Sequence, residues 1–219
     1  MIVDLKLCNR TDAIKLEVDD RFLAYLELRK DTFFHKIPTE KIRYYIDGAL
    51  AYGKQLAVTV DFVDSSELCD RLGVMVIKEI TGKTETVRGT LELVKNKKTI
   101  RMYQQSLRQV ARDHNITLAQ LEEAVLLHEL FHLLEEQTRS TTEQLERIET
   151  MQFLGFKRTA TVRQTREIAA HAFVKERMQL PFLPNYWDYS WEVEDTRESL
   201  LAIEEEFRSV MEKSVAGLE

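Results

Sequence analysis

The sequence is poor in the residues that interrupt or cross-link a chain. It contains only 3 prolines, 7 glycines and 2 cysteines among 219 residues. Together with 31% charged residues, this composition disfavours disorder and an all-β design and favours a high helical content. Two cysteines are too few to cross-link a chain of this size, so we expect a reducing, cytoplasmic setting. Asp4 and Lys6 interrupt the apolar start, so no secretory leader is expected.

Long apolar runs and a surplus of basic residues are also missing. No uncharged apolar run approaches the roughly 20 residues that span a bilayer, which excludes a membrane-embedded protein. The formal net charge is −6, whereas nucleic-acid binding needs a basic face. We therefore expect neither a membrane nor a nucleic acid as a partner.

A buried helix is expected to begin after Thr117. Thr117 and Gln120 have the spacing of a capping box, which marks a helix N-terminus. Apolar residues then recur every three or four positions in two strips as far as Leu134, so the helix should be buried on most sides. Residues 135–137, two glutamates and a glutamine, are expected to form its solvent-exposed end.

Within that helix, His128-Glu129-Leu130-Phe131-His132 forms an H-E-x-x-H motif. Residues four apart lie on one helix face, so His128 and His132 can bind one tetrahedral zinc ion. Glu129 then lies beside the metal, where it can act as the general base toward the catalytic water. The alternative is a helix that carries two histidines at this spacing by coincidence.

A catalytic zinc needs a third protein ligand and an open position, so another donor is required. The helix-prone segment Thr165–Val174 carries Glu167 and His171 four residues apart on one face. Either side chain could reach the metal. We expect Glu167 to be the ligand and His171 to stabilise the oxyanion of a tetrahedral intermediate. The alternatives are a solvated Glu167 paired with Arg163 or Arg166, and a His171 in the core.

These motifs resemble those of the gluzincin clan of zinc peptidases. The H-E-x-x-H motif is followed by Glu167-x-x-Ala170-x-x-Phe173 and then by Pro181. This spacing is similar to that of the cytosolic ImmA/IrrE-type metallopeptidases, and the resemblance covers residues 99–184.

The resemblance implies a zincin-like fold, with His128, His132 and Glu167 as zinc ligands and Glu129 as the base. The sequence departs from the family pattern at two points. Phe131 stands where a small residue, often glycine, usually precedes the second histidine, and the gap from that histidine to the glutamate is long. The gap leaves room for an inserted loop or short helix in residues 139–162, which could cover the site.

The fold expected from these patterns is α+β. A small mixed sheet should precede the motif helix, and a mostly helical half should follow it. We expect one domain with an α/β lobe at 1–115 and a helical lobe with the metal site at 116–219. Strands are expected at residues 2–7, 56–63, 74–80, 87–94 and 99–103. Further helices are expected at residues 21–30, 40–52, 65–72, 104–114, 143–154 and 192–213, with a linker at 156–162.

Two segments are candidates for substrate contact. Thr99–Tyr103 could be an edge strand that binds an extended peptide as an added strand, with Ile100 and Met102 in contact with the substrate. The alternative is an ordinary strand. The aromatic segment Pro181–Tyr189 could line the cleft, and Tyr186 could help to hold an oxyanion. Alternatively, its aromatic side chains pack on the core.

The function expected from the sequence is zinc-dependent hydrolysis of peptide bonds, and the family resemblance implies a specific cytosolic protein such as a repressor as the substrate. One alternative is a noncatalytic zinc-binding structural or interaction protein. Another is a zinc hydrolase that acts on a nonpeptide amide. The acidic helix expected at 192–213 could brace the fold or form a homo-oligomer.

Overall fold

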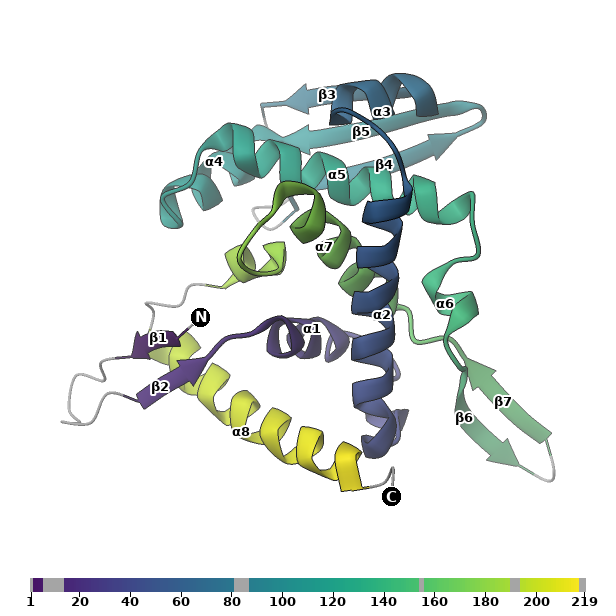
Figure 1. The fold of residues 1–219 in the computed structure, drawn as a ribbon, viewed down its shortest axis with the longest axis vertical. Helices are drawn as coiled ribbons and strands as arrows, with labels where there is room; N and C mark the ends of the chain where they lie inside the picture. The colour runs from purple at the N-terminus through teal and green to yellow at the C-terminus, as the bar shows by residue number, and fades with distance from the viewer. Residues whose placement is uncertain (1, 6–13, 81–86, 154–155, 190–193, 217–219) are drawn as a thin grey trace.

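The computed structural model describes residues 2–5, 14–80, 87–153, 156–189 and 194–216. In that part of the chain the fold is α+β, as expected, and helices predominate (Figure 1). The strands are β1 (Ile2–Leu5), β2 (Ile14–Glu17), β3 (Val74–Glu79), β4 (Gly89–Val94), β5 (Lys97–Tyr103), β6 (Ile148–Phe153) and β7 (Phe156–Ala160). The α-helices are α1 (Asp20–Leu28), α2 (Thr39–Thr59), α3 (Ser65–Leu72), α4 (Gln104–Asp113), α5 (Leu118–Glu136), α6 (Thr141–Gln144), α7 (Gln164–Met178) and α8 (Glu194–Ala216). Two 3₁₀ segments are η1 (Phe34–Lys36) and η2 (Pro184–Asp188).

A small mixed sheet precedes the motif helix α5, as the sequence predicts. Its strand order is β3-β5-β4, with β3 parallel and β4 antiparallel to the central strand β5. Ile100 and Met102 of β5 lie in the same buried apolar cluster as Leu127 and Leu130 of α5. The sheet therefore packs against the motif helix and supports it (Figure 1).

Helices α2, α5 and α7 meet behind the motif. The α5 N-terminus has the predicted capping box, in which Thr117 and Gln120 each accept a hydrogen bond from the other's backbone N–H. Helix α2 packs closely along α7 at Gly53, where a Cβ atom would lie 2.0 Å from the carbonyl oxygen of Ala169. Only glycine allows the two helices to approach this closely.

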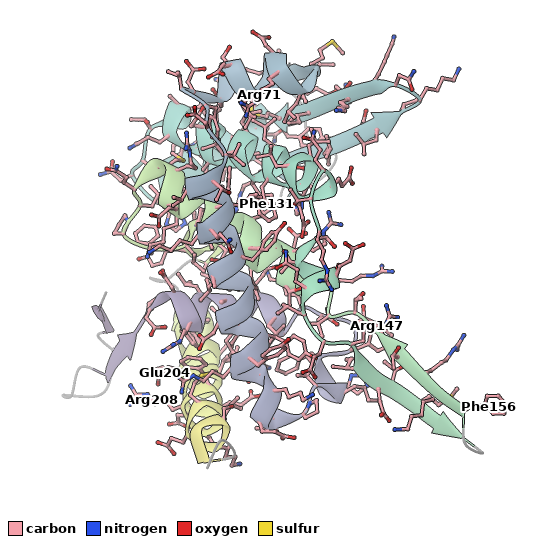
Figure 2. The ribbon with its side chains drawn as sticks, turned by 45° about the vertical axis from the view of Figure 1, so that its right-hand side comes forward. Arg71, Phe131, Arg147, Phe156, Glu204 and Arg208 are labelled. Atoms are coloured by element: carbon pink, nitrogen blue, oxygen red, sulfur yellow. The ribbon has the colours of Figure 1, made fainter. Side chains whose placement is uncertain are left out.

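Phe131 lies near the centre of the molecule (Figure 2). It is fully buried, with its ring centroid 5.6 Å from that of Phe173 in α7 and 6.2 Å from that of Tyr52 in α2. The large residue inside the motif therefore joins all three helices, where a small residue would leave a cavity.

The C-terminal helix α8 packs against α2 and α1 (Figure 1). Leu200 and Val210 are buried in the apolar cluster that these helices share, and the Tyr25 hydroxyl donates to Glu206 at 2.8 Å. Through this face α8 braces the fold, and its role in a homo-oligomer stays a prediction. In the described residues no helix is long and apolar enough to cross a membrane.

The predicted strand at 56–63 is wrong, because α2 continues to Thr59. Leu56 and Ala57 are adjacent in the sequence and both are buried, at 7% and 2% exposure. Adjacent residues can share a buried face on a helix, whereas a strand points them to opposite faces. The alternation of apolar residues from Leu56 onward therefore did not indicate a strand. Packing against α7 keeps residues 56–59 helical.

The predicted helix at 143–154 and linker at 156–162 are also wrong. After the short α6, strands β6 and β7 form an antiparallel hairpin with a bulge between Glu149 and Met151. Cross-strand pairing outweighs the helix propensity of the glutamate-rich start of this segment. The hairpin extends away from α5 and α7, with the 81%-exposed Phe156 near its tip, so it does not cover the motif (Figures 1 and 2).

Candidate metal centre

Glu167 of α7 reaches the two motif histidines of α5. Its Oε2 lies 3.1 Å from His128 Nε2, its Oε1 lies 3.6 Å from His132 Nε2, and the two Nε2 atoms are 3.3 Å apart. Ligand atoms arranged tetrahedrally at the usual zinc distances lie about 3.3 Å from one another. The three side chains therefore fit a zinc ion with only small movements. Among the described residues, no other group of His, Cys, Asp or Glu side chains has such spacing.

The electrostatics of this cluster favour a cation. Burial alone would raise the pKa of Glu167, but hydrogen bonds and charge from His128 and His132 hold that pKa well below its ordinary value. Burial would likewise lower the pKa of His132, yet nearby carboxylates, led by Glu135 and Glu167, raise it to about 9. Without a metal, His132 holds a proton beside these carboxylates, and a divalent ion can replace that proton.

Glu135 is fully buried, at 0% exposure, so the prediction that it belongs to a solvent-exposed helix end is wrong. Arg166 Nε donates to its Oε2 at 2.5 Å, and the backbone N–H of Thr141 donates to its Oε1 at 2.7 Å. Burial opposes ionisation, but His132, Thr141 and Arg166 lower the pKa of Glu135 to about 2. Helix periodicity could not reveal this, because the cationic partner comes from α7. Arg166 thus pairs with Glu135 rather than with Glu167.

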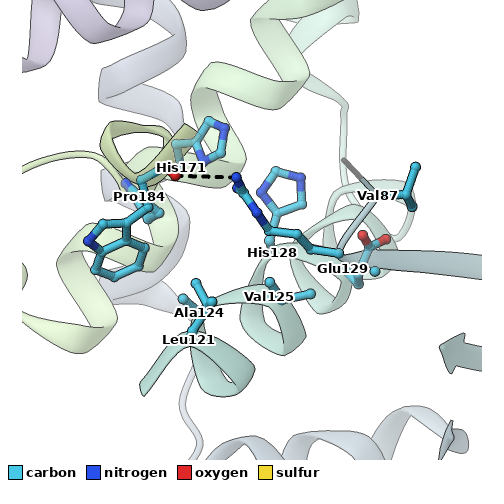
Figure 3. Close-up of a pocket in the computed structure, with 11 residues that line it drawn as sticks. Val87, Leu121, Ala124, Val125, His128, Glu129, His171 and Pro184 are labelled. Carbon is cyan, nitrogen blue, oxygen red and sulfur yellow. Dashed lines mark hydrogen bonds between the residues drawn. The ribbon is translucent and has the colours of Figure 1, made fainter. Parts of the chain in front are cut away.

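A cavity of about 260 Å³ opens beside His128 (Figure 3). Glu129 and Val125 of α5 line it together with His171 of α7, and Pro184 of η2 forms part of its wall. The general base expected from the motif therefore faces the same space as the first histidine. Pro184 and Trp187 of the aromatic, proline-containing segment contribute to this wall, which is one of the two arrangements that the sequence left open.

His171 lies one turn after Glu167 on α7, with its ring centroid 4.9 Å from that of His128. Its nitrogens are not part of the cluster of ligand atoms, so the geometry favours Glu167 as the third ligand. Burial, and then the neighbouring His128, lower the pKa of His171 well below its ordinary value, which keeps the imidazole neutral. Its Nδ1 atom is buried and has no hydrogen-bond partner among the described residues. His171 thus lines the cavity and has one ring nitrogen without a partner among the described residues.

The prediction that Thr99–Tyr103 is an edge strand is wrong, because β5 is the central strand of the sheet. Ile100 and Met102 are buried at 0% and 2% exposure under α5, so they cannot contact a substrate. Strand β4 is instead the edge strand next to the cavity. A Cβ atom at its first residue, Gly89, would lie 2.5 Å from Val125 Cγ1 and 3.4 Å from Glu129 Oε1. The edge of the sheet thus begins directly against the motif helix.

Tyr186 is not brought to the cavity wall. Its ring packs 4.2 Å from that of Phe182 and 6.1 Å from that of His114, measured between centroids. Its neighbour Trp187 lines the cavity instead. In the structure Tyr186 packs against other aromatic rings, and its role in holding an oxyanion stays a prediction.

Among the cavity residues that sequence reasoning missed are Arg88 and Gly89. Arg88 pairs with Asp188 and donates from Nη2 to the carbonyl oxygen of Trp187 at 3.3 Å, which ties the start of β4 to η2. A glycine at the start of a strand is a weak sign of close approach by another element. Nothing in the sequence marks Arg88, because its partner lies 100 residues away.

Comparisons with known proteins do not place the chain in a family. No family model, no curated protein and no solved structure matches it.

Proposed function

We propose that this chain is a zinc-dependent peptidase with a zincin-like architecture. The observation that carries the proposal is the spacing of His128, His132 and Glu167, whose ligand atoms are 3.1 to 3.6 Å apart. Three such donors leave a fourth position free, as in catalytic rather than structural zinc sites. Glu129 lines the same cavity as His128, which supports its role as the base.

His128 and His132 through Nε2, and Glu167 through a carboxylate oxygen, would hold the metal. When bound, zinc supplies Lewis acidity, which polarises the scissile carbonyl and makes a water molecule more acidic. Glu129 accepts the proton that this water loses as its oxygen attacks the carbonyl carbon. Glu129 then delivers the proton to the amine nitrogen as the carbon–nitrogen bond breaks.

We propose that His171 helps the same step, because it lines the same cavity as His128 and Glu129. As a neutral imidazole in the cavity wall, it can donate a hydrogen bond from its protonated ring nitrogen to the oxygen that gains negative charge. Its position one turn after Glu167 on a rigid helix fixes the ring relative to the ligands. We therefore assign it to oxyanion stabilisation rather than to metal binding.

The edge strand β4 supports a peptide as the substrate. Within the described residues β4 pairs only with β5, so its other edge is free to pair with an extended chain. Because Gly89 lies against Glu129 and Val125, a peptide added along this edge would pass the proposed base. The apolar part of the cavity, formed by Leu121, Val125 and Trp187, can accept a side chain. We propose a specific protein as the substrate. The free, buried Cys69 is consistent with a reducing cytoplasm as the setting.

The first test is the zinc content of the purified wild type and of His128→Ala, Glu167→Ala and His171→Ala variants. We expect about one zinc per chain in the wild type. Of the three variants, only His171→Ala should retain it. If His171→Ala loses zinc and Glu167→Ala keeps it, the third ligand is His171 rather than Glu167. If the wild type binds no metal under any reconstitution condition, the two histidines are a coincidence and the proposal fails.

Glu129→Gln separates a peptidase from a noncatalytic zinc protein. The variant should keep its zinc and lose roughly 10²- to 10⁴-fold of its activity, since glutamine cannot accept the proton. A peptide library analysed by mass spectrometry provides the assay, because it does not presuppose the sequence that is cleaved. Cleavage by the variant at the rate of the wild type would exclude this mechanism.

A further inference from the structure

An ion pair between the buried Glu135 carboxylate and the partly exposed Arg166 guanidinium joins the two helices that carry the proposed ligands. Glu135 lies three residues after His132 on α5, and Arg166 immediately precedes Glu167 on α7. Arg166 Nε donates to Glu135 Oε2 at 2.5 Å. The backbone N–H of Thr141, at the start of α6, donates to the other carboxylate oxygen at 2.7 Å. The carboxylate thus fixes the end of α5 relative to the beginning of α7.

The same carboxylate faces the second nitrogen of His132. His132 Nε2 points to His128 and Glu167, so it is the nitrogen that would bind the metal. In a neutral imidazole the other nitrogen, Nδ1, must then carry the hydrogen. His132 Nδ1 is buried, has no hydrogen-bond partner among the described residues and lies 3.9 Å from Glu135 Oε2. A movement of about 1 Å would bring the two atoms to hydrogen-bond distance.

We propose that Glu135 is a positioning residue of the metal centre: it accepts a hydrogen bond from Nδ1–H of His132, and its ion pair with Arg166 sets the distance between His132 and Glu167. The residues of the proposed metal centre on α5 therefore follow the pattern H-E-x-x-H-x-x-E, in which the last glutamate is Glu135. The inference rests on the proposed metal-binding function, which the wild-type titration below tests separately.

A purely structural role does not explain this pair well. Desolvation of the buried Glu135 carboxylate offsets much of its attraction to Arg166, and apolar residues of similar size often stabilise a fold as well as such a pair or better. The pair instead stands next to two ligands on two helices, where a small shift changes the distances between ligand atoms. Partners that orient a metal-binding histidine typically strengthen metal binding 10- to 100-fold.

The test is a competitive zinc titration against a chromophoric chelator, with wild type, Glu135→Gln and the double variant Glu135→Met/Arg166→Leu. Glutamine keeps the shape but loses the charge. The double variant removes both charges and so leaves no unpaired ion in the core. We expect zinc affinity to fall roughly 10-fold in Glu135→Gln and up to roughly 100-fold in the double variant. The visible absorption bands of bound Co²⁺ should shift in both, since they report the ligand geometry.

Glu204→Gln is the matched control. Glu204 is also a nearly buried carboxylate, 6% exposed and paired with Arg208, but it lies on α8 away from the metal ligands (Figure 2). This variant should lose some stability and keep wild-type zinc affinity and Co²⁺ spectrum. Wild-type affinity and spectrum in a folded double variant would overturn the positioning role of Glu135. A wild type that binds no zinc would instead overturn the metal centre itself.

Discussion

Gly53→Ala tests how strongly the close packing of α2 on α7 supports both the fold and the proposed metal site. A Cβ atom at this position would lie 2.0 Å from the carbonyl oxygen of Ala169, 2.8 Å from its carbonyl carbon and 2.9 Å from Ala172 Cβ. Two of these neighbours are backbone atoms, which cannot rotate away. The helices must therefore separate by about 1 Å to restore van der Waals contact.

The magnitude follows from two opposing effects. Overpacking a core typically costs about 1–3 kcal/mol, and a rigid backbone neighbour places Gly53→Ala at the upper end of that range. Replacing a glycine inside a helix with alanine stabilises the folded state by about 1 kcal/mol, because alanine has the higher helix propensity. The free energy of unfolding should therefore fall by about 2 kcal/mol, which for a chain of this size lowers Tm by roughly 4–8 °C.

The same shift should reach the metal site, because Ala169 is two residues after Glu167 on α7. We expect weaker zinc binding by Gly53→Ala in addition to its lower stability in urea denaturation. Gly48→Ala, in the same helix, is the control. Its Cβ atom would meet only the end of the Leu145 side chain, at 2.7 Å from Cδ2, and that chain can rotate. If Gly53→Ala is as stable as Gly48→Ala, the backbone contact does not limit the packing.

Two further predictions follow from the cavity and the core. Gly89→Ala should lower kcat/KM by roughly tenfold at unchanged zinc affinity, because the added Cβ would press on Val125 and approach the Glu129 carboxylate. An unchanged rate would show that β4 does not set the position of the base. Burial raises the pKa of Cys69 to about 11 from an ordinary value of 9.0, so its thiolate is about a hundredfold scarcer near neutral pH. In a Cys8→Ser variant, iodoacetamide should therefore modify Cys69 slowly in the native state and at the ordinary rate in urea, and equal rates would refute its burial.

Local physics determined the features that the sequence predicted well. The two histidines share a face because they are four residues apart on a helix, and the capping box at Thr117 marks where that helix begins. The short helix α3 ends at Gly73, whose φ of 66° suits glycine. The hairpin of β4 and β5 follows from two apolar runs that flank a short polar turn. Each signal lies within a few residues of the structure that it specifies.

Only the tertiary structure decided which strand is the edge and which apolar pattern is a helix. Strand order depends on pairing between distant segments, so β5 became central when β3 joined it in parallel. Residues 56–59 joined α2 because they pack on α7, while residues 148–153 became a strand because β7 pairs with them. In these segments local propensity was weak, and nonlocal contacts outweighed it.

The metal site divides in the same way. H-E-x-x-H is a local arrangement, so the sequence alone predicts that His128, Glu129 and His132 lie together on one turn of helix. Glu167 could be suggested but not separated from His171 until the crossing of α5 and α7 set the distances. Glu135 looked like an ordinary surface carboxylate, and only the approach of Arg166 from another helix allows its charge to be buried. The sequence by itself determined which donors share a helix face, and the packing of helices decided which other charges meet them.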